Sequence, residues 1–474
     1  MSARFDSMLV LESASGCSLT SLSLEVGASL RVLPGRREVF SARVTDLDQP
    51  VVVKCYLPHA KQTRDWEKEW GGLQTLQRLG LPAPGPLAVC RNSTGEICVV
   101  MEQLADAVTL GTYLEDVAGR RDSSLMKKLV RLVDQLHEAG ARQGDQHVDN
   151  WAVSGGQVFL LDAGTFQFHS RPLSAKERLE DLAAICATLP PEAEQDFRKT
   201  LFSCEGGPVV NARDDLTEAV LEEAIVRLQS ERARKYFKKT QRDCTEFASR
   251  ENTTGSGIFS RSADKTLVDR FFDDPETLMA EGRRLKSGNT CTVQQFECNG
   301  RAYVLKRYNK KPFWSQCRRS LSPSRARLSW SSAWVLHLAF VPTAKAVAFM
   351  DEGGFPRGRS YFLMESINAE LLADYARGIS GDAAKVAELV ESVGRIWDCL
   401  GRLRAVHGDL KATNWMVNSD NKVFLFDLDS FRFGLSDGAF DRGRRKDLKR
   451  FLKNWSSWPE IGEAFRRRMK GGEP

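Results

Sequence analysis

One motif set occurs twice in this chain in the same order, and this repeat constrains the fold more than any other feature of the sequence. The chain reads RQGDQHVDNWAVSGGQVFLLDAGTFQF around residue 145 and VHGDLKATNWMVNSDNKVFLFDLDSFRF around residue 409. The residues that match include Asp145 with Asp409, Asn150 with Asn414, and Asp162 with Asp427. So many identities over so short a stretch, with one gap, indicate an internal duplication.

The repeat extends well beyond this motif. Lys54 ends the apolar run VVVK, and Lys306 ends the run YVLK in the second copy. Each lysine is followed by a segment of helical periodicity that ends at a proline turn, WGGLQTLQRLGLPAP or WSSAWVLHLAFVPTA. Two apolar strands, ICVVMEQL and YFLMESI, then run into Glu102 and Glu365. Helices are predicted over residues 125–139 and 386–404, just before the two Asp motifs.

This order of elements is typical of a two-lobed kinase. We therefore expect an α+β protein built from two tandem protein-kinase-like domains, each with a β-rich N-lobe and a helical C-lobe. A chain of 474 residues is too long for one ordinary core and suits two domains of about 200 to 250 residues. The first domain is predicted over residues 1–245 and the second over 263–474. Residues 246–262, which are rich in Gly, Ser and Thr, are predicted to form the linker.

The composition describes a folded protein, with 42% hydrophobic and 27% charged residues. The net charge of +6 is mild; it permits an anionic partner such as a nucleotide, and we expect no nucleic acid. The eleven cysteines have no zinc-binding spacing and are expected to be reduced. The N-terminal residues 1–16 do not read as a signal peptide, and the most apolar stretch, 333–350, contains His337, Pro342 and Lys345. These features predict a cytoplasmic protein.

The repeated residues suit phosphoryl transfer, which needs an oriented hydroxyl, magnesium and charge neutralisation. Asp145 and Asn150, like Asp409 and Asn414, have the spacing of a kinase catalytic loop, and a strand-terminal Asp follows each pair. The first Asp of each set is predicted to accept the proton of the attacking hydroxyl. The oxygen ligands for Mg²⁺ are then predicted to be Asn150 and Asp162 in copy one and Asn414 and Asp427 in copy two.

The nucleotide is expected to be held by Lys54 and Lys306, which supply point charges to the phosphates of ATP. In active kinases this lysine pairs with a helix glutamate; Glu69 is the predicted partner of Lys54, with Glu67 as the alternative. Glu102 and Glu365, at the ends of their strands, are predicted to line the nucleotide site.

The two copies differ at accessory positions. Copy two has Ser329 where copy one has Glu69, but it has Lys411 two residues after its Asp, where it could meet the transferred phosphate. Copy one has His147 there, and its D-A-G contains Gly164 where copy two has Asp429. The expected phosphate-covering turns, Pro34–Arg37 and Ser287–Asn289, lack the G-x-G-x-x-G pattern.

Several prominent residues have structural interpretations as well. Trp151 and Trp415 are expected in the core. His407 is expected to support its loop rather than act as a base, because Gln143 replaces it in copy one. Asp181 and Asp447 are expected to hydrogen-bond the backbone of the catalytic loops.

Copy two resembles the lipopolysaccharide kinases, which phosphorylate inner-core heptose or Kdo sugars in Gram-negative bacteria. The resemblance rests on VLKRYNKK, RRSLSPSRARLSW, HGDLKATNW, LFDLDSFRF and RRKDLKRFLKNW, and it covers nearly all of residues 280–460. Copy one is similar to the same superfamily across residues 30–240, through EWGGLQTLQRLGLPAP, RQGDQHVDNW and LLDAGTF.

The resemblance implies a cytoplasmic enzyme that uses ATP and Mg²⁺ at the inner face of the inner membrane. Its partner would be a lipid-linked core oligosaccharide, with transient contact to the membrane surface. Asp409 or Asp145 would be the base, and Lys306 or Lys54 would bind ATP. The basic run KKPFWSQCRRSLSPSRAR could dock the anionic glycolipid or that surface.

Two other functions fit parts of the sequence. A small-molecule kinase of the aminoglycoside or choline type also carries H-G-D, although the SPSRARLSW stretch argues against it. A kinase-fold scaffold without turnover would explain Ser329 and the poor glycine loops. The acceptor sugar, the active copy and the oligomeric state are not determined by the sequence.

Overall fold

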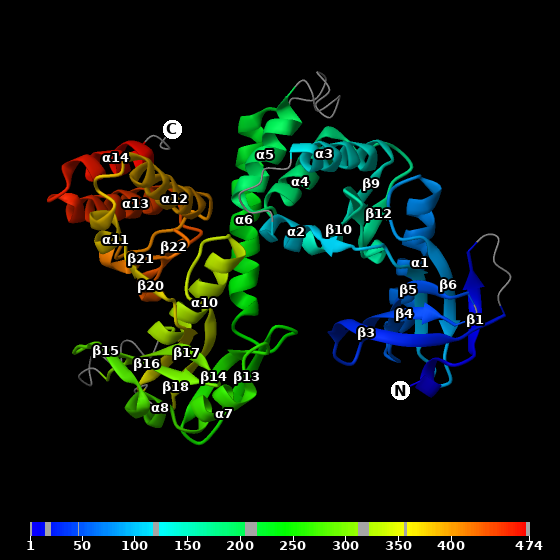
Figure 1. Cartoon of the computed structure of the whole chain (residues 1–474), viewed down its shortest axis with the longest axis horizontal. Helices are drawn as coiled ribbons and strands as arrows, with labels where there is room; N and C mark the ends of the chain where they lie inside the picture. Colours follow the sequence, from blue (N-terminus) through cyan, green and yellow to red (C-terminus); the bar gives the residue numbers. More distant parts are fainter. Residues whose placement is uncertain are drawn as a thin grey trace. The chain divides into compact units, whose positions relative to one another are not determined.

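The computed structural model describes residues 2–14, 20–45, 47–116, 123–203, 216–310, 322–354 and 358–470. The chain divides into two compact units, Met1–Ile225 and Val226–Pro474. Each unit mixes helix and sheet, in agreement with the α+β prediction (Figure 1). The boundary falls inside helix α6 (Glu218–Lys239), about twenty residues before the predicted end of the first domain.

A seven-stranded sheet forms one part of the first unit, in the order β2-β1-β6-β7-β5-β4-β3. The neighbouring strands are antiparallel. Helix α1 (Gln62–Arg78) packs on this sheet and buries Trp70, Leu73 and Leu76. The strands are β1 (Met8–Ser13), β2 (Ser21–Leu22), β3 (Leu24–Leu33), β4 (Arg37–Val44), β5 (Gln49–Tyr56), β6 (Pro86–Arg91) and β7 (Ile97–Glu102).

The helical part of the first unit is centred on α3 (Ser123–Glu138). Its buried Leu125, Leu129, Leu132 and Leu136 recur at helical spacing, which is the periodicity that predicts this helix. Helix α4 (Ala175–Cys186) begins at a capping box formed by Ser174 and Glu177. The other elements are β8 (Val108–Thr109), α2 (Leu110–Asp116), β9 (Ala141–Gln143), β10 (Trp151–Ser154), β11 (Gln157–Leu160), β12 (Phe166–Phe168) and α5 (Pro191–Phe202).

The second unit repeats a five-stranded part of the first sheet, which includes the strand that carries the lysine. Its sheet has the order β13-β14-β18-β19-β17-β16-β15, so the run β18-β19-β17-β16-β15 matches β6-β7-β5-β4-β3. The extra hairpin differs, because the second strand of the pair, rather than the first, lies beside the shared five. The strands are β13 (Phe247–Glu251), β14 (Gly255–Ser260), β15 (Arg283–Ser287), β16 (Cys291–Cys298), β17 (Arg301–Tyr308), β18 (Ala346–Glu352) and β19 (Ser360–Glu365).

The prediction of a linker over residues 246–262 is wrong, because this segment forms β13 and β14 of the second sheet. Its glycines reflect close backbone contact rather than a flexible connection. A Cβ at Gly255 or Gly257 would overlap the backbone of β18. The composition that resembles a linker therefore belongs to a crowded strand.

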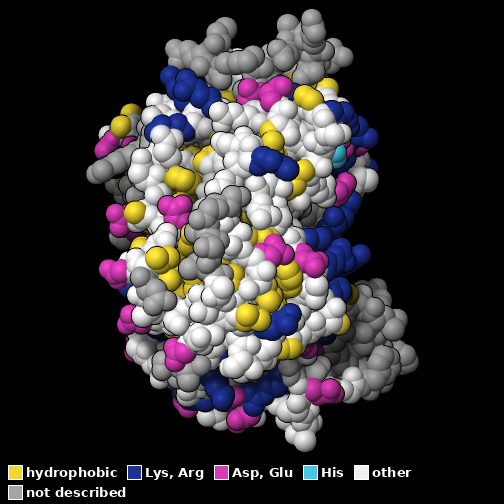
Figure 2. All heavy atoms as spheres, turned by 90° about the vertical axis from the view of Figure 1, so that its right-hand side faces the viewer, with side chains coloured by type: hydrophobic (Ala, Val, Ile, Leu, Met, Phe, Trp, Pro, Cys, Tyr) yellow, Lys and Arg dark blue, Asp and Glu magenta, His cyan; other side chains and the backbone are white. Residues whose placement is uncertain are grey.

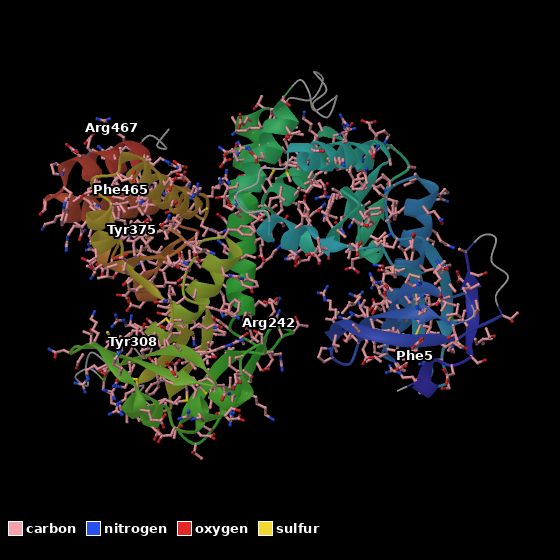
Figure 3. The ribbon with its side chains drawn as sticks, in the orientation of Figure 1. Phe5, Arg242, Tyr308, Tyr375, Phe465 and Arg467 are labelled. Carbon is pink, nitrogen blue, oxygen red and sulfur yellow. The ribbon has the colours of Figure 1, made fainter. Side chains whose placement is uncertain are left out.

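The helical part of the second unit contains a large apolar core. Trp397, Trp415 and Phe465 are fully buried in it, and Figure 3 labels Phe465 of α14. Helix α10 (Arg325–Leu338) packs on the sheet and on the turn η6 (Leu428–Ser430). The remaining elements are α7 (Lys265–Asp273), α8 (Pro275–Glu281), β20 (Ala369–Leu371), α11 (Leu372–Gly378), α12 (Ala383–Arg402), β21 (Trp415–Asn418), β22 (Val423–Leu425), α13 (Asp437–Leu452) and α14 (Pro459–Lys470).

Among the described residues, no helix combines the length and the apolar character needed to cross a bilayer. On the face drawn in Figure 2, lysine and arginine side chains lie in several separate groups among acidic and hydrophobic ones. The basic run predicted to dock an anionic surface falls largely on residues 311–321, which lie outside the described part of the chain.

Candidate functional site

In the first unit the repeated geometry starts at Lys54 on β5. Its neighbours Val53 and Cys55 are fully buried on the opposite face of the sheet, so the lysine faces α1 and the motif loops. The Lys54 Nζ lies 2.5 Å from Glu69 Oε1 and 2.9 Å from Asp162 Oδ1. The predicted partner Glu69 is thus confirmed over Glu67, which is exposed.

Asp162 follows β11 in a left-handed turn, with φ of 55°. Few non-glycine residues adopt this conformation, and it turns the carboxylate toward Lys54. Arg37 Nη1 lies 3.4 Å from the same carboxylate oxygen. Burial would raise the pKa of Asp162, but the charges of Lys54 and Arg37 outweigh burial and lower the pKa. The carboxylate is therefore ionised at neutral pH.

The loop from Asp145 to Asn150 is joined to this turn through the backbone. The Asn150 side-chain amide donates to the Asp145 carbonyl at 2.8 Å, and Leu161 N donates to the Asn150 carbonyl at 2.8 Å. Because Leu161 directly precedes Asp162, these bonds bring Asn150 and Asp162 to one edge of the β10–β11 hairpin. Asn150 is buried, whereas Asp145 is exposed.

The second unit holds its lysine in a different way. Lys306 Nζ contacts Asp427 and lies 3.4 Å from Asp429 Oδ2. Ser329, at the position of Glu69, instead lies 2.9 Å from the Tyr308 hydroxyl. Burial would lower the pKa of Lys306, but the negative charges of the Asp427 and Asp429 carboxylates raise it. The lysine is therefore charged despite being buried.

Asp427 repeats the conformation of its counterpart, with φ of 66°. Burial would raise the pKa of Asp427, but Lys306 above all lowers it. The Asn414 amide donates to the Asp409 carbonyl at 2.8 Å, and Phe426 N donates to the Asn414 carbonyl at 3.1 Å. The predicted metal ligands of copy two are thus arranged as in copy one.

Two cations contact Asp409 in the second unit, whereas Asp145 makes no ion pair with the described residues of the first. Lys411 Nζ lies 3.0 Å from Asp409 Oδ2, and Arg450 Nη1 lies 3.0 Å from Asp409 Oδ1. Arg450 also donates to the Gly408 carbonyl at 2.6 Å. Lys411 was predicted here, whereas Arg450, from α13, was not, because its contact depends on how α13 packs.

The two loops are anchored differently. Asp447 accepts from the backbone of His407 at 2.7 Å and of Gly408 at 3.1 Å, which confirms its expected structural role. The expectation is wrong for Asp181, which accepts from the side chains of His137 and Gln146. The first catalytic loop thus lacks the carboxylate clamp on its backbone within the described residues.

His407 supports its loop, as expected. Its Nε2 lies 2.9 Å from the Phe426 carbonyl, and Gln143 donates at 3.0 Å to the equivalent Leu161 carbonyl of the first unit. His407 is fully buried. Burial lowers its pKa, so the ring is neutral at pH 7.

The predicted nucleotide contacts Glu102 and Glu365 are not brought into these clusters. Glu102 pairs with Val51 and Glu365 with Tyr303, each three residues from the lysine on the neighbouring strand. Alternation along a strand therefore places both glutamates on the face opposite to the lysine. Glu102 accepts from Gly85 N at 3.3 Å, and Glu365 pairs with Lys345 at 3.3 Å.

The hairpins in the place of glycine loops carry a shared feature that the sequence did not reveal. Arg31 pairs with Val39, which pairs with Lys54, and Lys286 pairs with Val293, which pairs with Lys306. A register shift lies just before the basic residue in both hairpins. Such bulges re-aim side chains next to functional sites. Arg31 and Lys286 therefore share a sheet face with the buried lysines.

The donor atoms in both units fit magnesium and a nucleotide. In each unit the asparagine side-chain amide donates to a backbone carbonyl. The side-chain oxygen of the asparagine is therefore available as a ligand, beside the ionised carboxylate of Asp162 or Asp427. The described residues hold no group of three or more His, Cys, Asp or Glu placed to bind a metal unaided. Mg²⁺ commonly takes one or two carboxylates plus the phosphate oxygens of its substrate, so this sparse set suits it.

A comparison with known families shows what the whole chain is similar to. The sequence profile of the lipopolysaccharide kinase (Kdo/WaaP) family matches residues 52–189 and 271–464, more than half of the chain. The chain belongs to this family. No curated protein matches the chain.

One matched segment of the Kdo/WaaP family profile lies in each compact unit. The first runs from β5 to beyond α4, and the second runs from α7 into α14. Lys54, Asp145, Asn150 and Asp162 fall in the first segment, and their counterparts fall in the second. The predicted resemblance to lipopolysaccharide kinases is confirmed, and the family supports phosphotransferase activity.

Proposed function

We propose that this protein is an ATP-dependent kinase that phosphorylates a heptose or Kdo sugar of the lipopolysaccharide inner core. In this proposal both units are protein-kinase-like domains and the second carries out the transfer. The acceptor is a lipid-linked core oligosaccharide, met at the cytoplasmic face of the inner membrane through transient surface contact.

The observation that carries the proposal is the loop around Asp409. Its backbone is fixed by Asp447 through His407 N and Gly408 N. Its carboxylate lies 3.0 Å from both Lys411 and Arg450. A fixed carboxylate can accept the proton of an acceptor hydroxyl, and the two cations can neutralise charge that develops on a transferred phosphoryl group.

The remaining residues of the second unit would hold the nucleotide. Lys306 would contact the phosphates, while Asn414 and Asp427 would offer oxygen ligands to Mg²⁺. Lys286 faces the same side of the sheet and would add a charge where other kinases place a glycine loop. When bound, Mg-ATP supplies the phosphoryl group, and the protein supplies the position and the charge.

A specific observation favours a second role for the first unit. Lys54, Glu69 and Asp162 form a complete pairing on the nucleotide side. On the acceptor side, Asp145 is exposed, its loop lacks a backbone clamp by Asp181, and His147 stands in place of Lys411. This combination suits a domain that binds nucleotide and transfers phosphate slowly or not at all.

Mass spectrometry of the core glycolipid from cells that depend on this protein tests the function. Asp409→Ala should remove a phosphate from the core, because it removes the proposed base. Asp145→Ala should leave the phosphate in place. An unchanged phosphate count in cells with both substitutions would exclude a core-sugar kinase and would favour the small-molecule kinase or the scaffold.

A further inference from the structure

The buried lysine of each unit is held by a carboxylate, but the two carboxylates come from different elements. In the first unit Glu69 reaches Lys54 from helix α1 at 2.5 Å. In the second unit the equivalent helix position is Ser329, and Asp429 approaches Lys306 to 3.4 Å from the turn after β22. Without this contact Lys306 would have no substitute for the helix glutamate among the described residues.

The two arrangements compete for the same volume. A Cβ at Gly164, the counterpart of Asp429, would lie 3.0 Å from Glu69 Oε2 and 3.2 Å from Glu69 N. The φ of Gly164 is not positive, so its backbone does not require glycine. The lack of a side chain at this position instead provides space for Glu69. Gly164 N also donates to Glu69 Oε2 at 3.0 Å. Glu69 thus crowds the place that a side chain at position 164 would enter.

In the second unit the same volume is filled from the other side. Ser329 ends at its hydroxyl, which lies 2.9 Å from the Tyr308 hydroxyl. The Asp429 side chain is only 6% exposed. A short residue on the helix therefore accompanies a long one in the turn, and the reverse holds in the first unit.

A third position changes with these two. Helix α10 begins with Arg325, which pairs with Asp429, whereas the equivalent residue of α1 is Asp65, which pairs with Arg36. Arg325 and Lys306 lie 4.7 Å and 5.0 Å from the centroid of the same Tyr308 ring, labelled in Figure 3. Asp429 thereby links the lysine strand to the helix, as Glu69 does directly.

We propose that Asp429 replaces the helix glutamate in the second unit and is the residue that positions Lys306, with Arg325 joining it to α10. The inference rests on the proposed nucleotide role of Lys306. It makes Ser329 part of a working alternative arrangement rather than a sign of lost function.

The test is a four-way comparison in the full chain: the parent, Asp429→Gly, Ser329→Glu, and both together. The double variant rebuilds the Glu and Gly pair of the first unit. Without nucleotide, hydrogen exchange of α10 peptides should speed up by about tenfold in each single variant, as expected for loss or crowding of a charged hydrogen bond. The double variant should return to within about threefold of the parent.

Two controls are built into the chain. Peptides from α1 of the first unit should not change in any variant. Asp437 is an exposed residue of α13 that pairs with Arg404. Asp437→Gly removes this pair and should leave the hydrogen exchange of the α10 peptides as in the parent. If the α10 peptides of the double variant exchange as fast as those of the faster single variant, the proposal that Asp429 replaces the helix glutamate is wrong.

The second readout is kcat/KM for ATP. The value of kcat/KM should fall about tenfold or more in Asp429→Gly and should recover in the double variant. A merely structural role of Asp429 would not produce this fall and recovery. A parent that does not use ATP would refute the proposed function, while the exchange cycle would still decide the inference. Recovered exchange with unrecovered kcat/KM would contradict the positioning role.

Discussion

His407 and Gln143 occupy equivalent places and make the same bond with different chemistry. Each reaches the carbonyl of the residue before the strand-terminal Asp, at 2.9 Å and 3.0 Å. Only the histidine can take up a proton. Gln143 avoids this, although its Oε1 is buried without a partner in the described part of the chain.

This difference predicts a pH effect that one substitution removes. Burial lowers the pKa of His407 in the folded state, so the unfolded chain binds more protons as pH falls below about 6.5. Stability should be full above that pH and should fall by up to about 2 kcal/mol at pH 5. His407→Gln should be about 1 kcal/mol less stable than the parent at pH 8, but should lack this acidic loss.

Urea unfolding at pH 5 and pH 8 checks the prediction. His337→Gln, an exposed histidine on α10, is the matched control and should keep the pH profile of the parent. A His407→Gln variant that loses stability in acid as steeply as the parent would show that another group is responsible.

At the scale of elements, helix α1 depends on a close contact that only glycine permits. A Cβ at Gly72 would overlap the carbonyl of Ala163, next to Asp162. The equivalent residue of α10 is Ser332. Gly72→Ser should therefore push α1 from the turn, cost about 1–3 kcal/mol and weaken nucleotide binding by the first unit. Gly71→Ser, whose Cβ would meet nothing within 4 Å, is the control; equal losses in both would contradict the account.

The bulged hairpins make a second prediction at this scale. Lys286→Ala should raise the dissociation constant of Mg-ATP about three- to tenfold, since one phosphate contact is lost. Arg284→Ala lies on the same strand, but it pairs with Gln294 and faces away from Lys306. Its affinity should match that of the parent. Equal effects from both substitutions, measured by calorimetry, would mean that general charge rather than the register matters.

The elements also show what the sequence can and cannot predict. Helices α3 and α12 follow from apolar periodicity, and the Lys, Asp and Asn positions follow from local motifs. Strands β13 and β14 were not predictable from composition, because glycines needed for contact with β18 look like a linker. The pairing of Asp429 with Lys306 and Arg325 could not be predicted either, because it depends on how β17, α10 and the turn meet.

At the scale of the whole molecule, the two units share one set of motif residues, but each has a different part of the surrounding contacts. The first has the direct Lys–Glu pair, and the second has the clamped and charged Asp409 loop. The Lys, Asp, Asn and Asp positions are the same in both copies, so the differences lie in the residues around them. The two units together suggest duplication followed by specialisation.

The most direct test is the rate of phosphate transfer from ATP to purified core glycolipid by the full chain. Asp409→Asn should lower kcat by at least about a hundredfold, because it removes the base. Asp145→Asn, the same change in the first unit, should alter kcat by less than about threefold if that unit does not transfer. A chain that keeps its rate without Asp409, or loses it without Asp145, would contradict the assignment of transfer to the second unit.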